Sequence, residues 1–566
     1  MAAPAANTPG PGPRPPRRPA GWPEAAGEWA WLLGLFAAGL LSRWASRSQL
    51  VQAWDAGNFV LALDGFDLAS HVPHMPGVFW CLIALGRLLR PLTGGDGVAA
   101  LELVNALAAA STLPCGWWLG RSFGGRRVGA WLIGLLFSAP LLWYYASQPL
   151  SYGVELGWVV AIGGCAWRVA AGDDRLVLPL AALLATAGGI RPNTPLFLLP
   201  LVAVACWRGW RQGVAAWRFG AGIALGLGLL AAWGGAFLAE VGGVERFWPL
   251  FQAWKGDHSG QSRETGPWSN LWLLLRSVGL TAPAALALAL ARSPGRRLRR
   301  PPQPLSRQGR PDFATVTTSA SAATAVTLAA AERRWRRVFL GLWIAPSALY
   351  LVLVHFTRMG HATTLLPGVL LALAWRLGAT SDTGATSSAS TGASGPSPPA
   401  RGALRWPRDL ALVVTLQCLL FLLVPGDRFA ASLRDFDREW GQAIAAARRY
   451  DPATTLVITT GRSNLRAYRL PSVHLPAYDH EQADFRLDQQ GPTLAVRPPL
   501  RRLVVLDRGL RMEPPSLPGV RDLILIPGRL RLLEVPIPAT GLEVERGAVR
   551  ALPPRTEDTR ASQPPS

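Results

Sequence analysis

The chain has 566 residues, of which 50% are hydrophobic and 16% are charged. Soluble globular proteins carry about 25% charged residues, and the apolar residues of this chain fall in long blocks rather than in alternating patterns. The composition predicts a polytopic α-helical membrane protein. It excludes a cytosolic enzyme, and it excludes nucleic acid as the partner behind the net charge of +22.

The N-terminal residues 1–27 are rich in Pro, Ala and Gly and contain three arginines. A signal peptide places its basic residues directly before its apolar run, whereas this apolar run begins only near Trp29. We therefore predict a disordered cytoplasmic arm over 1–27 and a first span over 29–41. A polar first outer loop, 44–75, and an interfacial helix over 76–92 follow.

Further apolar segments are predicted to span the membrane after this interfacial helix. Cytoplasmic loops are enriched in Arg and Lys. If residues 76–92 form an interfacial helix rather than a span, all the arginine-rich loops lie on the cytoplasmic side. The result is one transmembrane domain, 28–425, with about eleven spans, an inner N terminus and an outer C terminus. Its later segments are 98–120, 128–146, 154–170, 176–190, 193–207, 219–240, 269–291, 338–354, 362–376 and 410–424.

Two segments between these spans have the composition of disordered cytoplasmic loops. Residues 293–337 combine arginines with a Thr, Ser and Ala run, and residues 379–408 are rich in Ser, Thr, Gly and Pro. Neither can bury enough apolar surface to fold alone.

From residue 426 the chain takes on the character of a water-exposed domain. An amphipathic helix and several short strands between turn residues predict a small α/β or mainly β extracytoplasmic domain over 426–551, followed by a disordered tail over 552–566. The helix is expected over 432–450 and the strands over 454–460, 493–496, 503–507 and 522–526.

The first outer loop gathers three carboxylates and two imidazoles within 20 residues, namely Asp55, Asp64, Asp67, His71 and His74. Charged groups close to a bilayer are costly unless they line water or have a partner. Asp55 follows Trp54, whose ring could raise the proton affinity of the carboxylate so that it acts as a general base on a hydroxyl. The same residues also fit an ordinary polar loop that caps two helices.

Four further motifs carry arginine, histidine or carboxylate side chains near the ends of predicted spans. In chain order they are Phe123-Gly124-Gly125-Arg126-Arg127, the outer segment 146–155 that ends at Glu155, Gly188-Gly189-Ile190-Arg191-Pro192, and Thr357-Arg358-Met359-Gly360-His361.

The order of these features resembles the GT-C superfamily of integral-membrane glycosyltransferases, which includes protein O-mannosyltransferases and the bacterial aminoarabinose transferase. Members carry an acidic residue in the first outer loop, where this chain has Asp55. They also carry a His-Pro-Pro or Lys-Pro-Pro-like element before a juxtamembrane helix, where this chain has His74-Met75-Pro76-Gly77. The motif Phe123–Arg127 is similar to the family's Phe-Gly-Arg-Arg turn. Glu155 stands where relatives often place a second carboxylate.

The resemblance implies a membrane glycosyltransferase of the prokaryotic inner membrane that moves a sugar from a polyprenyl-phosphate-linked donor to an acceptor hydroxyl on the periplasmic face, with inversion. The acceptor would be a lipid, a glycan or a protein. Asp55 would deprotonate the acceptor and Glu155 would position donor or acceptor, which makes these two the catalytic candidates. The candidates for substrate binding are Trp54, His74, Arg191, Lys255, Arg358 and His361.

The basic candidates lie on the predicted outer side, against the usual charge distribution. The planar guanidinium groups of Arg191 and Arg358 suit the oxygens of a phosphate. Each cation, including Lys255, could instead extend to lipid headgroups.

Three alternatives stay open on the sequence alone. A divalent metal could bind the carboxylates and imidazoles of the first outer loop, but the HxxxH and HExxH spacings are absent, so no metal ligand is assigned. A transporter or flippase would show internal repeats and charges at mid-span, and we find no convincing repeat. A non-catalytic envelope-glycan assembly protein would depend on its C-terminal domain rather than on Asp55 and Glu155.

Overall fold

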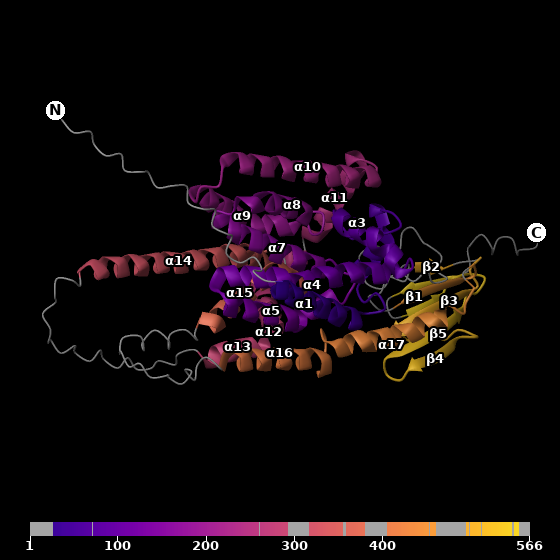
Figure 1. Cartoon of the computed structure of the whole chain (residues 1–566). Coiled ribbons are helices and arrows are strands. Elements are labelled where there is room, and N and C mark those ends of the chain that lie inside the picture. Colours follow the sequence, from indigo (N-terminus) through magenta and orange to yellow (C-terminus); the bar gives the residue numbers. More distant parts are fainter. Residues whose placement is uncertain are drawn as a thin grey trace, which may run out of the picture.

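The computed structural model describes residues 26–70, 72–259, 261–292, 316–354, 358–379, 405–451, 453–459, 494–496, 499–510, 512–545 and 548–553. Residues 1–25 of the predicted arm, 293–315 and 380–404 of the two predicted cytoplasmic loops and 554–566 of the predicted tail lie outside these residues. The described part is a long bundle of helices that carries a small sheet domain at one end (Figure 1).

The described part of the transmembrane domain is mainly helical. Each predicted span overlaps a helix or a bent pair of helices. These helices are α1 (Ala26–Ala45), α4 (Gly97–Gly124), α5 (Arg126–Ser138), α6 (Pro140–Ala146), α7 (Tyr152–Ala170), α8 (Val177–Ala187), α9 (Asn193–Arg211), α10 (Ala216–Val241), α12 (Gln261–Thr281), α13 (Pro283–Ala291), α14 (Val316–Leu353), α15 (Leu366–Ala379) and α16 (Arg405–Leu423).

Only some of these helices are long and apolar enough to cross a membrane. By length and apolar composition, 5 helices of the described residues can cross a membrane, or up to 7 if each bent pair is one span. Helix α8, with 11 residues, is only about 17 Å long, and the hydrocarbon core is about 30 Å thick. The predicted count of about eleven spans is therefore not confirmed.

Shorter helices fill the segments that connect the spans on one side of the bundle. Helix α2 (Trp54–Ala62) and the 3-10 helix η1 (Leu68–Ser70) lie in the predicted first outer loop, and α3 (Trp80–Leu89) occupies the predicted interfacial helix. Helix α11 (Val244–Ser259) connects α10 to α12.

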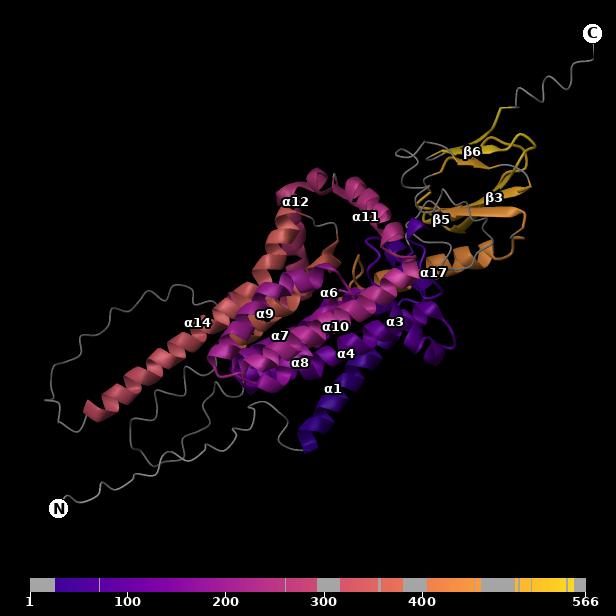
Figure 2. The same ribbon diagram turned by 90° about the horizontal axis from the view of Figure 1, so that it is seen from above.

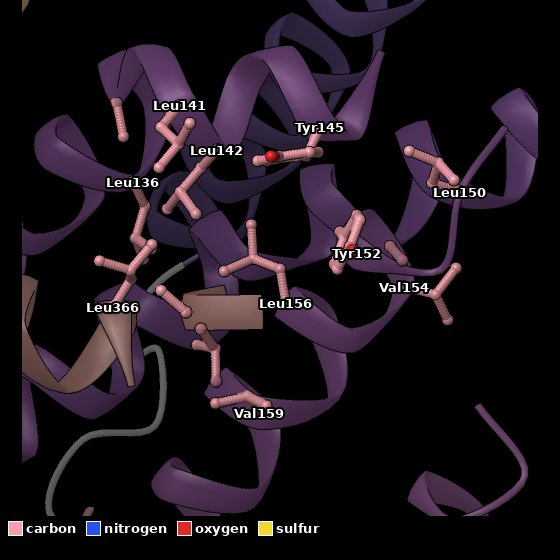
Figure 3. Packing of buried hydrophobic residues seen from close by; sticks show 14 of the residues in the cluster. Leu136, Leu141, Leu142, Tyr145, Leu150, Tyr152, Val154, Leu156, Val159 and Leu366 are labelled. Carbon is pink, nitrogen blue, oxygen red and sulfur yellow. The ribbon is translucent and has the colours of Figure 1, made fainter. Parts of the chain in front are cut away.

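Close packing of α4 against α5, next to the turn that joins them, depends on small residues. A Cβ atom added to Gly120 of α4 would lie 2.7 Å from the Cα atom of Gly129 in α5, so the two backbones approach closely only because both residues are glycines. Helices α5 and α6 meet at Pro140 with a bend of 55°. The apolar residues of α5 and α6 belong to the same buried cluster as Tyr152, Leu156 and Val159 of α7 (Figure 3).

Two helices extend into segments where loops were predicted. Helix α14 begins at Val316 rather than after residue 337, and α16 begins at Arg405 rather than after residue 408. The Ala-rich stretch before residue 337 has high helix propensity and continues the following apolar helix. With 38 residues, α14 is about 57 Å long, and its first part projects beyond the other helices (Figure 2).

The C-terminal domain combines a helix with two small sheets, as predicted in outline. Helix α17 (Ala430–Ala447) contacts a four-stranded sheet of order β1-β3-β5-β4, in which β1 and β3 are parallel and the other pairs are antiparallel. A three-stranded sheet has the order β2-β6-β7. The strands are β1 (Thr455–Thr459), β2 (Leu494–Val496), β3 (Arg502–Arg508), β4 (Arg521–Ile526), β5 (Leu530–Pro536), β6 (Leu542–Glu545) and β7 (Ala548–Ala551).

Strands β5, β6 and β7 were not predicted. Strand β5 is largely buried although its sequence contains charged residues. Their charges are paired, Arg531 with Asp507 and Glu534 with Arg502 at 2.8 Å. Such pairs form only once the neighbouring strands are in place.

Candidate active site

Asp55 lies in the first turn of α2, where the helix dipole favours a carboxylate. Its Oδ2 atom accepts a hydrogen bond of 2.7 Å from Nη1 of Arg358, and its Oδ1 atom lies 3.9 Å from Nδ1 of His74. Arg358 directly precedes the 3-10 helix η5 (Met359–Thr364), between α14 and α15. Three segments far apart in the sequence thus meet at one carboxylate.

The surroundings of Asp55 favour its charged form. Burial alone would raise the pKa of Asp55, but the nearby His74, Arg358 and Arg191 outweigh burial and hold this pKa below its usual value. The sequence-based expectation of a raised proton affinity is therefore wrong for this structure. The reason is that cations gather around the carboxylate, which the neighbouring residue Trp54 does not reveal. The side chain of Trp54 itself lies outside the described residues.

Glu155 is the second carboxylate of the site and lies in the first turn of α7, almost fully buried. Its Oε1 atom accepts hydrogen bonds from the hydroxyl groups of Thr194, at 2.8 Å, and Thr364, at 2.6 Å. Its Oε2 atom lies 3.2 Å from Nε of Arg191. Thr194 belongs to the first turn of α9 and Thr364 ends η5, so this carboxylate joins three elements of the bundle.

Arg191 lies between the two carboxylates. Besides pairing with Glu155, it contributes to the lowered pKa of Asp55. Its Nη1 atom donates a hydrogen bond of 3.2 Å to the hydroxyl of Ser151, and its guanidinium carbon lies 4.5 Å from the ring centroid of Tyr152. We call Asp55, His74, Glu155, Arg191 and Arg358 the polar cluster.

Tyr152 connects the polar cluster to η5. Its ring centroid is 6.2 Å from that of His361, and a Cβ atom added to Gly360 would lie 2.5 Å from its Cζ atom. The glycine therefore allows η5 to approach this ring closely, and it brings His361 to the edge of the polar cluster.

Lys255 has a different setting from the other substrate-binding candidates. It is exposed on α11, and among the described residues it forms no hydrogen bond or ion pair. The structure therefore does not join it to the polar cluster.

Among the described residues, the structure shows no set of ligands for a divalent metal. Within the described ranges, no group of three or more His, Cys, Asp or Glu side chains is close enough to hold a metal ion. Asp64 instead lies 2.6 Å from Nη1 of Arg90, and His71 lies outside the described residues.

Thr194, Thr364 and Tyr152 were not singled out as site residues from the sequence. Two weak signals could have found the threonines. Thr194 follows the Arg191 motif by two positions, and Thr364 follows the Arg358 motif by three. Nothing in their spacing indicates that both hydroxyl groups contact one carboxylate from another helix.

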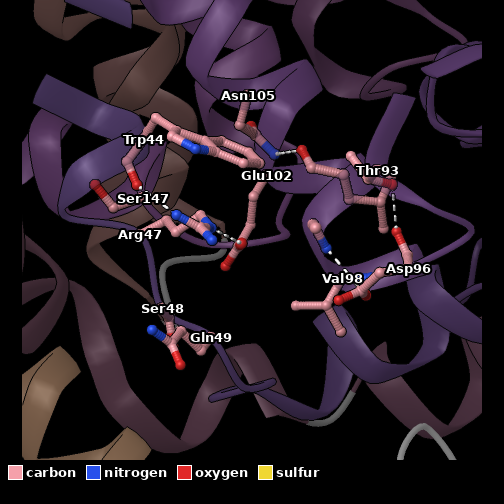
Figure 4. Close-up of polar contacts among 12 residues, drawn as sticks. Trp44, Arg47, Ser48, Gln49, Thr93, Asp96, Val98, Glu102, Asn105 and Ser147 are labelled. Carbon is pink, nitrogen blue, oxygen red and sulfur yellow. Dashed lines mark hydrogen bonds and ion pairs between the residues drawn. The ribbon is translucent and has the colours of Figure 1, made fainter. Parts of the chain in front are cut away.

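The C-terminal domain holds the segment that leads into α2. Asp437 of α17 accepts hydrogen bonds from the hydroxyl of Ser48 at 2.8 Å, from the backbone N–H of Gln49 at 2.8 Å and from that of Leu50 at 3.2 Å. The same segment is tied to the bundle by Arg47, whose Nε atom lies 3.6 Å from Oε2 of the buried Glu102 (Figure 4). Asp437 thus connects the C-terminal domain to the chain directly before Asp55.

Replacing Asp437 with Ala is expected to lower the stability of the protein by about 1–3 kcal/mol, because three donors lose a charged acceptor. Thermal unfolding of the purified protein in detergent measures the change. Asp435→Ala is the matched control on the same helix, since this carboxylate pairs with Arg438 at the surface and exposed pairs contribute at most about 1 kcal/mol. Equal losses in both variants would contradict the assigned role of Asp437.

No family model and no curated protein sequence matches the chain. The structure is similar to that of ArnT from Cupriavidus metallidurans in the apo state, with a TM-score of 0.52 and 12% identity over 90% of this chain and 98% of that chain. The structure of the same protein bound to undecaprenyl phosphate gives a TM-score of 0.53 at 12% identity, with the same coverage. AglB, an archaeal oligosaccharyltransferase from Archaeoglobus fulgidus, matches at a TM-score of 0.42 and 11% identity over 85% of this chain and 70% of that chain.

The similarity to ArnT covers nearly the whole of both chains. The chain therefore has the GT-C fold, and the resemblance drawn from the order of its motifs is confirmed at the level of the fold.

Proposed function

We propose that this chain is a membrane glycosyltransferase that moves a sugar from a polyprenyl-phosphate-linked donor to an acceptor hydroxyl. The observation that carries the proposal is the pairing of Asp55 with Arg358 beside the pairing of Glu155 with Arg191. Carboxylates and guanidinium groups at adjoining positions supply a base for a hydroxyl and a binding site for a phosphate leaving group. The GT-C fold agrees with this chemistry.

Asp55 is proposed as the general base. It takes the proton of the acceptor hydroxyl, and the acceptor oxygen attacks the anomeric carbon of the sugar. The bond from that carbon to the phosphate oxygen breaks, and the carrier phosphate leaves with the electron pair. Because the attack is in line with the leaving group, the configuration of the anomeric carbon inverts.

Arg358 and Arg191 are proposed to bind the carrier phosphate, with His74 and His361 beside it. Arginine presents several donors in a plane and binds phosphate oxygens more specifically than a point charge does. Glu155 is held by two threonine hydroxyls, so it can orient Arg191 and a sugar hydroxyl. Lys255 and Trp54 remain candidates for contacts with more distant parts of the substrate.

The carrier is proposed to be a polyprenyl phosphate or diphosphate, in keeping with the ArnT structure that is bound to undecaprenyl phosphate. The acceptor is a lipid, a glycan or a protein. We place the protein in a prokaryotic inner membrane, with the polar cluster and the C-terminal domain on the periplasmic side. Support comes from the arginines in the last turn of α9 and in the segment 333–337 of α14, which the positive-inside rule assigns to the cytoplasm.

The pairing of Arg358 with Asp55 leads to a prediction for the pH dependence. A carrier phosphate that binds Arg358 adds negative charge near Asp55 and weakens its pairing, so the pKa of Asp55 rises in the complex. The acid limb of kcat, which reports the complex, is expected at higher pH than that of kcat/KM, which reports the free protein. Rate profiles between about pH 3 and 8 measure both limbs. Coincident limbs, or the reverse order, would contradict the proposed competition.

The proposed function is tested with purified protein, a panel of radiolabelled polyprenyl-phosphate sugars and a membrane extract as the source of acceptors. Transfer of label from at least one donor, abolished by Asp55→Asn, is the expected result. Background transfer from every donor, with and without a divalent metal, would exclude the proposed enzyme. A non-catalytic assembly protein would instead keep its cellular activity in Asp55→Asn and lose it on deletion of 427–566.

A further inference from the structure

A second charged site lies between α14 and α15, away from the polar cluster. It is a cavity of about 660 Å³ whose lining includes Arg333, Arg336 and Arg337 of α14 with Trp375 and Arg376 of α15. Among the described residues, Glu332 is the only carboxylate in its lining. Four guanidinium groups therefore face one carboxylate, which leaves a net positive charge at the cavity.

The cavity lies at the opposite end of the bundle from the polar cluster. Helix α9 places Thr194 at the Glu155 end and Arg208 in its last turn. The guanidinium of Arg208 lies over the ring of Trp335, 4.3 Å from its centroid, and its Nη2 atom lies 3.5 Å from Glu332. From Arg336 to the end of α14 at Leu353, next to the Arg358 segment, the helix rises about 25 Å at 1.5 Å per residue. This distance approaches the thickness of the hydrocarbon core, about 30 Å.

The existing contacts do not neutralise the cavity. Glu332 is shared, since its two carboxylate oxygens lie 3.6 Å from Nε of Arg336 and 3.5 Å from Nη2 of Arg208. Arg333 and Arg337 have no ion-pair partner within the part of the chain that the structure describes. They are four residues apart on one helix face, where like charges repel. An anion bound between them would remove this repulsion.

Two aromatic rings hold one of these guanidinium groups in place. Arg336 packs against the rings of Phe123 and Trp375, with its guanidinium carbon 5.7 Å and 5.9 Å from their centroids. Its Nε atom is buried and makes no hydrogen bond to the described residues. A guanidinium that is fixed by aromatic rings loses little side-chain freedom when it binds an oxyanion.

We propose that this cavity binds the phosphate group of an anionic molecule at the membrane surface opposite the polar cluster. Arginine forks fit phosphate oxygens, and basic pockets between membrane helices bind anionic lipid headgroups. The phosphate would come either from an anionic phospholipid or from a soluble phosphate compound. The position of the cavity, about one hydrocarbon thickness from the polar cluster, favours the lipid headgroup. The proposed site does not depend on the proposed glycosyl transfer.

The test titrates the full-length protein in neutral detergent with three probes at constant ionic strength, and thermal unfolding reports binding. The probes are a short-chain phosphatidylglycerol, a phosphatidylcholine of the same chain length and inorganic phosphate. The double variant Arg333→Gln with Arg337→Gln removes the two guanidinium groups that have no ion-pair partner among the described residues. Arg334→Gln is the matched control, because this neighbour is exposed on the same helix but does not line the cavity.

We expect phosphatidylglycerol to raise the unfolding temperature of the wild-type protein and phosphatidylcholine to have little effect. The double variant should bind phosphatidylglycerol about tenfold or more weakly, which corresponds to about 1.4 kcal/mol, while Arg334→Gln stays within about twofold of the wild type. Without any probe, all variants should unfold at similar temperatures.

Three other outcomes are informative. Equal binding of inorganic phosphate and phosphatidylglycerol, both lost in the double variant, would support the phosphate site and overturn the lipid as its source. Equal weakening by Arg334→Gln would overturn the proposal in favour of a diffuse surface charge. The absence of any preference between phosphatidylglycerol and phosphatidylcholine, together with no effect of inorganic phosphate, would also overturn it.

Discussion

Replacement of Asp55 with Asn is expected to lower the rate of sugar transfer by about 10²–10⁴-fold, the range over which general base catalysis contributes. The amide keeps the size and shape of the side chain but cannot accept the proton of the acceptor hydroxyl. It also loses the charge that pairs with Arg358 at 2.7 Å. Single-turnover transfer of radiolabel from the donor, measured at saturating acceptor, separates the chemical step from binding.

The matched control for this variant is Asp96→Asn. Asp96 caps the N terminus of α4 by accepting hydrogen bonds from the backbone of Val98 and Ala99, and Asn is an equally good N-cap residue. The control changes the same charge at the same end of the bundle and should retain wild-type rates. Wild-type turnover in Asp55→Asn would contradict the assignment of the base, whatever the control does.

Replacement of Arg358 with Ala is expected to lower kcat by about 10²–10³-fold, because loss of one group that stabilises a developing negative charge typically has this effect. Arg358 is proposed to bind the leaving phosphate, whose charge grows as the glycosidic bond breaks. Arg358→Lys restores the charge without the planar fork, so it should recover part of the rate. Steady-state kinetics with a defined polyprenyl-phosphate sugar measure kcat and KM for each variant.

The Arg358→Ala variant has a second expected effect, on Asp55. Removal of this guanidinium takes away one of the cations that lower the pKa of Asp55, so the acid limb of kcat/KM should move to higher pH. A merely structural role for Arg358 would reduce the amount of folded protein without moving this limb. Arg90→Gln is the control, because Arg90 pairs with the half-exposed Asp64 outside the polar cluster. A change in KM alone, with kcat and the pH profile preserved, would show that Arg358 contributes only to ground-state binding.

The helical membrane architecture could be predicted from the sequence because apolar length is a local property. A block such as 219–240 must avoid water along its whole length, whatever its neighbours are, and α10 occupies it. The order of the short motifs also pointed to the GT-C fold, which the similarity to ArnT confirms. The extent of α14 could not be predicted, because the composition of 316–337 fits both a loop and a helix that projects from the bundle.

The contacts within the candidate site could not be predicted from the local sequence. The sequence indicated that Asp55, Glu155, Arg191 and Arg358 are unusual in apolar surroundings, since charges near a bilayer need partners. It did not indicate which residues would be the partners. Asp55 and Arg358 are 303 positions apart, and Asp437 is 389 positions from Ser48. Only the packing of the helices sets these distances.

The tertiary structure also decided the electrostatics around Asp55. The sequence placed an aromatic residue beside Asp55, which suggested a raised proton affinity. Folding instead brings His74, Arg191 and Arg358 close to the carboxylate and lowers its pKa. The sequence by itself therefore determined the class of architecture and the candidate charges. The contacts among those charges, and the protonation that follows from them, depend on Coulomb interactions over a few ångströms, which exist only in the folded chain.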